Sequence, residues 1–176
     1  MKALALRTRL RNADRDGDAC LLIYDGVNLA SSTISADVRD ILARRPNTPW
    51  IYVLCPFLSP GIASETLFGG LAQERSGSRI SLVHLHNDVD GCRIKHNDGS
   101  GSLHDLEAEL VHGWLFDLFD SRSGLMKAPA GVHFTKLSGQ HADKFLRASN
   151  VLLTSAAVGA IAFFCLALIG KGHGCW

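Results

Sequence analysis

Residues 19–26, ACLLIYDG, decide the first part of the fold, because six apolar or aromatic residues in a row end at an Asp-Gly pair. A short run of this kind, bounded by turn-forming residues, is typical of a strand that is buried on both faces. Similar runs, rich in aromatic and β-branched residues, stand at 50–54 (WIYVL) and 79–86 (RISLVHLH). The first half of the chain is therefore predicted to contain three strands.

A helical pattern follows each predicted strand. After the first strand, Ile34, Val38 and Ile41 recur at helical spacing, and Pro46 predicts the end of that helix. A second helix is predicted from Pro60, a residue suited to a first helical position, to about residue 75.

The segment after the third strand, residues 87–102, is rich in glycine and aspartate and is predicted to form a loop. Ser102 and Asp105 have the spacing of a capping box, which predicts that the third helix begins there. Its apolar stripe is expected to consist of Leu103, Leu106, Leu110, Trp114 and Leu118.

This alternation predicts an α/β fold with a three-strand Rossmann-like unit, paired in parallel through right-handed crossovers. We expect the start of a second α/β unit with a long apolar C-terminal helix to follow it. The expected parts are a polar N-terminal segment (1–18), the Rossmann-like unit (19–120), a linker (121–132) and a partial second unit (133–176).

Ligands in parallel sheets bind beyond the carboxyl ends of the strands. Asp25 stands where α/β enzymes often place a catalytic or magnesium-binding carboxylate, although aspartate before glycine is also a common turn pair. The sequence contains no GxGxxG, no GxxxxGK[ST] and no GxSxG motif. The expected strand ends carry Asp25-Gly26, Cys55-Pro56 and Asn87-Asp88.

His84, His86 and Asp88 alternate along the third predicted strand and therefore share one of its faces. Two imidazoles and a carboxylate suit zinc or iron, and Asp90 or His96 would add a further ligand. This interpretation predicts a small metal-dependent hydrolase. The alternative is that both histidines line a sheet face beside a polar loop.

Charge and cysteine content restrict the classes of partner and compartment. The 176 residues have a formal net charge of +1, which provides no long-range attraction to nucleic acid, so we expect no nucleic-acid partner. The five cysteines are widely spaced and include no CxxC pair, which favours reduced thiols over a disulfide framework or a structural zinc site. The start of the chain lacks the apolar h-region of a secretory signal, and we expect a cytoplasmic protein.

A separate signal lies at residues 131–145, GVHFTKLSGQHADKF, which resembles the N-terminal segment of the orotate phosphoribosyltransferases. In that family a phenylalanine, a lysine and a Ser-Gly pair form a hood over the base. The resemblance extends over residues 131–170. It implies a base- or nucleotide-binding protein whose substrate-binding residues are Lys136, Ser138, Gly139, His141 and Asp143.

The resemblance also implies magnesium and phosphoribosyl diphosphate as ligands of a complete protein. Two features depart from the family pattern. Leu137 separates Lys136 from Ser138, whereas the family places its lysine directly before Ser-Gly. The family's diphosphate-binding loop, an acidic pair followed by small residues and Thr-Gly, does not occur after residue 170. We therefore expect a truncated relative, without a cofactor of its own, that does not complete the reaction.

Residues 151–170, VLLTSAAVGAIAFFCLALIG, contain no charged side chain. A helix of this length would be about 30 Å long, close to the hydrocarbon thickness of a bilayer. One interpretation is a buried helix, covered by the sheet, by a second chain or by another copy in a homo-oligomer. The other is a C-terminal membrane anchor on a cytosolic α/β binding protein.

Overall fold

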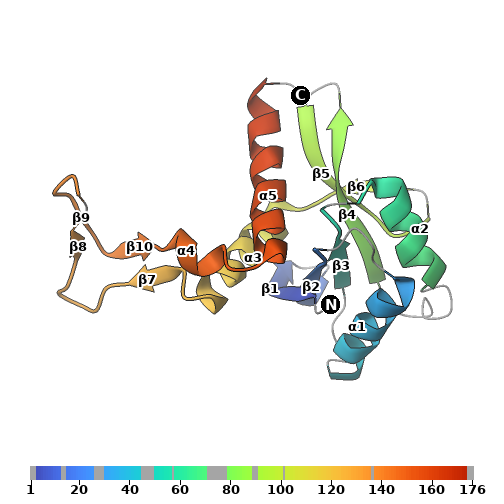
Figure 1. Ribbon diagram of the computed structural model, residues 1–176, viewed down its shortest axis with the longest axis horizontal. Coiled ribbons are helices and arrows are strands. Elements are labelled where there is room, and N and C mark those ends of the chain that lie inside the picture. The colour runs from blue at the N-terminus through green and yellow to red at the C-terminus, as the bar shows by residue number, and fades with distance from the viewer. Residues whose placement is uncertain are drawn as a thin grey trace.

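The structure is a computed structural model that describes residues 3–12, 15–25, 30–44, 50–56, 58–70, 79–88, 91–100, 102–135 and 137–173. Its centre is a six-stranded mixed sheet with the strand order β1-β2-β3-β4-β5-β6 (Figure 1). The middle strands β2, β3 and β4 pair in parallel, and the other neighbours pair antiparallel. The strands are β1 (Leu4–Asn12), β2 (Arg15–Ile23), β3 (Trp50–Leu54), β4 (Arg79–Asp88), β5 (Gly91–Asn97) and β6 (Leu103–Asp105).

Helices cover both faces of the sheet (Figure 1). Leu22 of β2 faces a core that is completed by α1 and α2, whereas Leu21 and Ile23 face a core completed by α3 and α5. Side chains of a strand point alternately to the two faces, so an uninterrupted apolar run such as that of β2 requires a helical layer on each side. The helices are α1 (Ser31–Arg44), α2 (Pro60–Gly70), α3 (Ala108–Ser121), α4 (Ala148–Val151) and α5 (Ser155–His173).

The predicted fold class is wrong. The three predicted strands belong to a larger mixed sheet, because the antiparallel strands β1, β5 and β6 extend it on both sides. β5 arises from the segment predicted to be a loop, where Ile94 pairs with Leu85 of β4 and packs against the core. The C-terminal helix also packs on this sheet instead of starting a second α/β unit.

The predicted long apolar C-terminal helix is wrong as well. The run 151–170 is divided, because α4 ends at Val151, the chain turns at Leu152 and Leu153, and α5 begins at Ser155. One side of α5 is buried on the sheet, with Ala157 and other small or aromatic residues in the core. Among the residues that the structure describes, no helix has both the length and the apolar character needed to cross a membrane.

The third helix was predicted to begin too early. Residues 103–105 form the edge strand β6, and α3 begins at Ala108, with Glu107 at its N-cap and no side-chain capping hydrogen bond. The central part of the predicted stripe is correct, since Leu110, Trp114 and Leu118 are fully buried. Leu103, in contrast, lies on the exposed edge of the sheet.

Trp114 is the largest side chain in the core between the sheet and α3. Its ring packs edge-to-face on Tyr52 of β3, with ring centroids 5.2 Å apart. Its indole Nε1 donates a hydrogen bond to the carbonyl oxygen of Ala19 at 3.5 Å. The indole therefore connects α3 to the two central strands β2 and β3.

A close approach between α3 and the edge strand β1 depends on Gly113. A β-carbon at this position would lie 2.6 Å from Cβ of Thr8, closer than real Cβ contacts allow. The backbone N–H of Arg7 donates to Oδ2 of Asp117 at 2.9 Å. A carboxylate of α3 thus accepts a hydrogen bond from the backbone of this edge strand. Both contacts hold α3 directly against β1.

Between α3 and α4 the chain leaves the body and forms a projecting arm, defined here as residues 122–147 (Figure 1). Two short antiparallel ribbons build it, one from β7 and β10 and one from β8 and β9. The four strands are β7 (Leu125–Lys127), β8 (Phe134–Thr135), β9 (His141–Ala142) and β10 (Lys144–Leu146).

Replacing Trp114 by alanine should lower the free energy of unfolding by roughly 3–5 kcal/mol, because a fully buried aromatic side chain is lost. Denaturant titration followed by circular dichroism measures the change. Phe116→Ala is the matched control on the same helix, since Phe116 is 54% exposed, and it should change stability by less than about 1 kcal/mol. Equal effects of the two changes would contradict the observed orientation of α3.

Gly113→Ala should destabilise the protein by about 1–3 kcal/mol, because the new methyl group forces α3 away from β1. Gly61→Ala is the control, since an added Cβ at this position of α2 meets nothing within 4 Å. The control should be neutral or slightly stabilising, as alanine favours helices over glycine. Thermal unfolding of both variants measures the difference, and an unchanged midpoint for Gly113→Ala would show that α3 does not approach β1 this closely.

Candidate functional site

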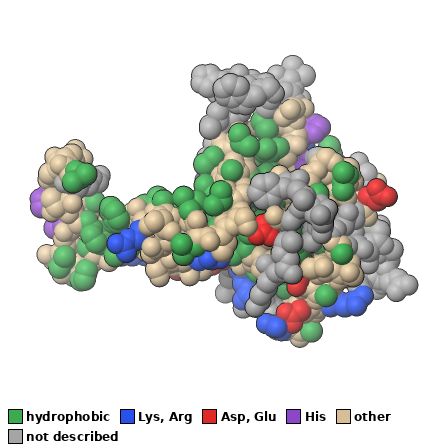
Figure 2. Space-filling view, viewed as in Figure 1, with side chains coloured by type: hydrophobic (Ala, Val, Ile, Leu, Met, Phe, Trp, Pro, Cys, Tyr) green, Lys and Arg blue, Asp and Glu red, His purple; other side chains and the backbone are tan. Residues whose placement is uncertain are grey.

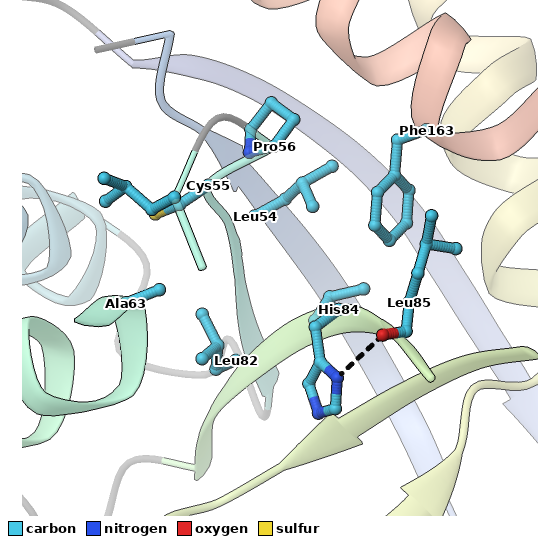
Figure 3. Close-up of a pocket in the computed structure, with 10 residues that line it drawn as sticks. Leu54, Cys55, Pro56, Ala63, Leu82, His84, Leu85 and Phe163 are labelled. Atoms are coloured by element: carbon cyan, nitrogen blue, oxygen red, sulfur yellow. Dashed lines mark hydrogen bonds between the residues drawn. The ribbon is translucent and has the colours of Figure 1, made fainter. Parts of the chain in front are cut away.

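A cavity of about 170 Å³ lies at the carboxyl end of β3, beside the middle of β4 (Figure 3). Most of its lining is apolar, and the exceptions are the imidazole of His84 and the thiol of Cys55. The cavity lies beside the predicted ligand-binding edge of the parallel strands. Its lining comes from β3 and the turn after it, α2, β4 and α5: Leu54, Cys55, Pro56, Leu58, Ala63, Leu82, Val83, His84, Leu85 and Phe163.

His84 is half-buried, and its Nδ1 lies 3.4 Å from the carbonyl oxygen of Leu85. Burial lowers the pKa of the imidazole below its usual value, because the charged form loses hydration. His86 and Lys95 lower this pKa further, while the Leu85 carbonyl acts in the opposite direction. His84 is therefore a neutral imidazole near pH 7, with one donor and one acceptor nitrogen.

The predicted metal ligands are only partly described. His84 and His86 lie side by side on β4, with ring centroids 6.4 Å apart in an edge-to-face arrangement. The side chain of Asp88 and all of Asp90 lie outside the described residues. His96 is buried on the opposite face of the sheet, where its ring packs on Tyr52. Within the described part of the chain, no group of three or more His, Cys, Asp or Glu side chains could hold a metal ion.

Cys55 is a free thiol directly after β3. Burial raises its pKa to about 12, because the thiolate would lose its hydration. The thiol is thus protonated at neutral pH, whereas the thiolate is the nucleophilic form. Cys55 belongs to the core between the sheet and α1/α2.

Asp25 has a structural partner at the end of β2. Ser155 Oγ, at the first residue of α5, donates a short hydrogen bond to Oδ2 of Asp25. A carboxylate at a helix N-terminus is also stabilised by the helix dipole. This contact between residues 130 positions apart ties α5 to the end of β2 and gives Asp25 a structural role.

The residues of the predicted base-binding hood lie on the arm, away from the cavity at the sheet edge (Figure 1). Ser138 and Gly139 form the turn between β8 and β9, His141 lies in β9, and all three are exposed, as is Asp143. Gly139 has a φ of 77°, a left-handed conformation that side chains with a Cβ disfavour. The predicted ligand Lys136 lies outside the described residues.

The base of the arm is fixed to the body. The backbone N–H of Gly124 donates to the Phe119 carbonyl oxygen at 2.7 Å, and the N–H of Arg147 donates to the Gly124 carbonyl oxygen at 2.7 Å. The buried Val151 packs directly on Gly124, and the Asn150 amide donates to the Ser123 carbonyl oxygen at 3.2 Å. The two ends of the arm are therefore clasped together, and the arm leaves the body in a defined direction.

The arm exposes apolar and basic side chains (Figure 2). Leu137 is fully exposed at the turn, and Phe145 and Leu146 of β10 are 43% and 54% exposed. The sequence did not indicate that these side chains form an exposed apolar surface. The feature of the sequence that could have indicated them is the basic composition of residues 122–147, which contain five Lys or Arg and one Asp.

Alkylation should distinguish the two classes of cysteine. Cys165 on the exposed side of α5 should react with iodoacetamide in the folded protein at pH 8, whereas Cys55 should stay unmodified because it is buried and its pKa is raised. Peptide mass spectrometry before and after denaturation measures both sites. Rapid modification of Cys55 in the folded state would contradict its burial.

No family model, no characterised protein and no solved structure matches this chain. The resemblance of residues 131–170 to the orotate phosphoribosyltransferases therefore stays a prediction that rests on those residues alone. Direct measurement of base binding is the way to test it.

Proposed function

We propose that this chain is a protein-interaction module in which an α/β body presents the arm for association with a second copy of the chain. The observation that supports this proposal is the exposure of Leu137, Phe145 and Leu146 on a projecting arm. Exposed apolar clusters are typical of binding sites, and Phe145 and Leu146 are neighbours on β10. Burying the fully exposed Leu137 would contribute roughly 1.5–3 kcal/mol, and burying the partly exposed Phe145 and Leu146 would contribute less.

The clasp at the base of the arm supports the same proposal. An arm anchored by backbone hydrogen bonds at Gly124 and Arg147 loses less conformational freedom on binding than a free tail would. A preorganised hairpin can also keep its apolar side chains apart from the body of its own chain. This geometry favours a partner outside the molecule over intramolecular burial.

Exposed apolar residues continue beyond the arm onto α4 and α5 (Figure 2). A second copy that contacted the arm could cover this side of α5 too. Coverage by another copy is one of the interpretations that the apolar run 151–170 suggested. The residues concerned are Leu152, Leu153, Val158 and Leu166, which are between 44% and 72% exposed.

We place the protein in the cytoplasm. Cys55 and Cys165 are free thiols, which suits a reducing compartment.

The combined change Leu137→Ser and Leu146→Ser should weaken self-association by about tenfold or more, because the arm loses two apolar anchors. Sedimentation equilibrium over a range of protein concentrations measures the dissociation constant. Phe116→Ser, an equally drastic change at an exposed site on the body, is the control and should leave association unchanged. A wild-type protein that remains monomeric at the highest accessible concentration would refute the proposed function.

Base recognition is the second candidate, and the conformation of Gly139 is the observation that favours it. In the resembling family the Ser-Gly pair brings backbone donors close to a planar acidic base, and here Gly139 adopts a backbone conformation suited to glycine. Lys136, Ser138, His141 and Asp143 would supply the polar contacts. Magnesium and phosphoribosyl diphosphate would be ligands of a complete protein only.

Gly139→Ala should weaken the binding of orotate measured by calorimetry by about 1–3 kcal/mol if Ser138-Gly139 contacts the base. Gly131→Ala is a closely matched control, because Gly131 lies on the same arm with a φ of 81° and open space around an added Cβ. It should strain the backbone equally without affecting binding. If the wild type takes up no orotate, or if both variants bind equally well, this candidate fails.

A further inference from the structure

Charge is segregated along this chain in two adjacent blocks. Residues 98–120 contain six Asp or Glu and no Lys or Arg. Residues 122–147, the arm, contain five Lys or Arg and one Asp, a net charge of +4, so the rest of the chain carries −3 of the total of +1. The arm projects away from the body (Figure 1), and the two blocks are therefore displayed on different parts of the molecule.

The acidic block includes one edge of the sheet. β6 is the last strand in the sheet order, and its three side chains, Leu103, His104 and Asp105, are exposed. The opposite edge strand β1 differs, because Asp117 of α3 accepts a hydrogen bond from the backbone of Arg7. An edge strand with outward-directed backbone groups is a template for strand addition.

A depression of about 500 Å³ adjoins this edge on the side of α2. Leu103 of β6 and Phe68 of α2 form its apolar lining, and Glu65 is an exposed carboxylate at its border. Asp98 lies between two further lining residues, and Lys95 of β5 pairs across from Asp105. The site thus combines an apolar surface with excess negative charge from Glu65 and Asp98.

The backbone directions of β6 and β10 match each other. Leu106 N–H donates to Ile94 of β5, so by alternation Leu103 and Asp105 direct their backbone groups outward. On the arm, the N–H of Arg147 donates to the carbonyl oxygen of Gly124, so Arg147 directs its backbone groups toward the β7 side. By the same alternation, Lys144 and Leu146 direct their backbone groups away from β7. The outward-directed residues are spaced two apart in both strands.

Building on the proposed function, we propose that β10 of one copy pairs antiparallel with β6 of a second copy. The register that aligns the outward-directed groups places Leu146 opposite Leu103, Phe145 opposite His104, and Lys144 opposite Asp105. It therefore joins apolar with apolar, aromatic with aromatic, and basic with acidic side chains, the kinds of cross-strand pair that stabilise sheets. Leu146 and Lys144 then lie on the face of β6 that carries the depression.

The partner is a second copy because the same chain carries both complementary surfaces. A two-fold axis would allow each copy to donate its arm to the other, so the short β10–β6 contact is formed twice. Two contacts are needed, because a pairing of three residues buries less surface than a stable interface requires. The reciprocal arrangement also lets each basic arm meet an acidic edge.

Charge reversal on both strands tests this pairing by sedimentation equilibrium. Asp105→Lys and Lys144→Glu should each weaken self-association about fivefold or more, and the double variant should return to within about twofold of the wild type. Asp40→Lys is the control for the charge change, since Asp40 lies on α1 and forms a surface ion pair with Arg44. Association of the control should match that of the wild type, and near-ultraviolet circular dichroism checks that each variant is folded.

Three outcomes would overturn the pairing. If Leu137→Ser with Leu146→Ser weakens association while the charge reversals do not rescue each other, the arm docks elsewhere and the proposed function still stands. If the wild type is monomeric, both proposals fail. If Lys144→Glu instead abolishes binding to vesicles of anionic phospholipid and Asp105→Lys has no effect on self-association, the arm binds a membrane surface rather than a second copy.

Discussion

Burial of both faces of the parallel strands β2, β3 and β4 is the constraint on which the rest of this structure depends. Their apolar runs expose a hydrophobic surface on each side, and neither side can remain in water. The crossover helices α1 and α2 cover one face. The other face is closed by α3 and α5, which come from the second half of the chain. The C-terminal segment is therefore part of this core.

The arm follows from the same constraint. Val151 of α4 joins α3 and α5 in covering this face, whereas none of the described residues of the arm belongs to that core. The arm residues leave the body as two short ribbons, held by the clasp around Gly124 and Val151. Its exposed leucine and phenylalanine side chains are then available to a partner, and its basic charge is displayed apart from the acidic edge at β6.

The side chains at the strand ends that suggested a catalytic or metal site mainly make structural contacts in the folded protein. Burial raises the pKa of Cys55 and lowers that of His84, which leaves both uncharged at neutral pH. Asp25 holds Ser155 at the start of α5. The cavity beside them has a volume close to that of a small aromatic molecule and an apolar lining. The surface of the arm is therefore a better candidate for function than the cavity at the end of β3.

The sequence alone was enough to locate the central strands and the buried side of α3, because apolar runs and the spacing of Leu110, Trp114 and Leu118 are local patterns. It did not reveal β5 and β6, since β5 forms by pairing with β4, and β6 forms in turn by pairing with β5. It also could not decide between one long helix and two shorter ones at 151–170. That choice depends on the space left on the sheet, where small residues such as Ala157 and Ala160 pack closely while the chain turns at Leu152 and Leu153. Both features depend on tertiary contacts, because strand pairing and the covering of a sheet face join residues that are far apart in the chain.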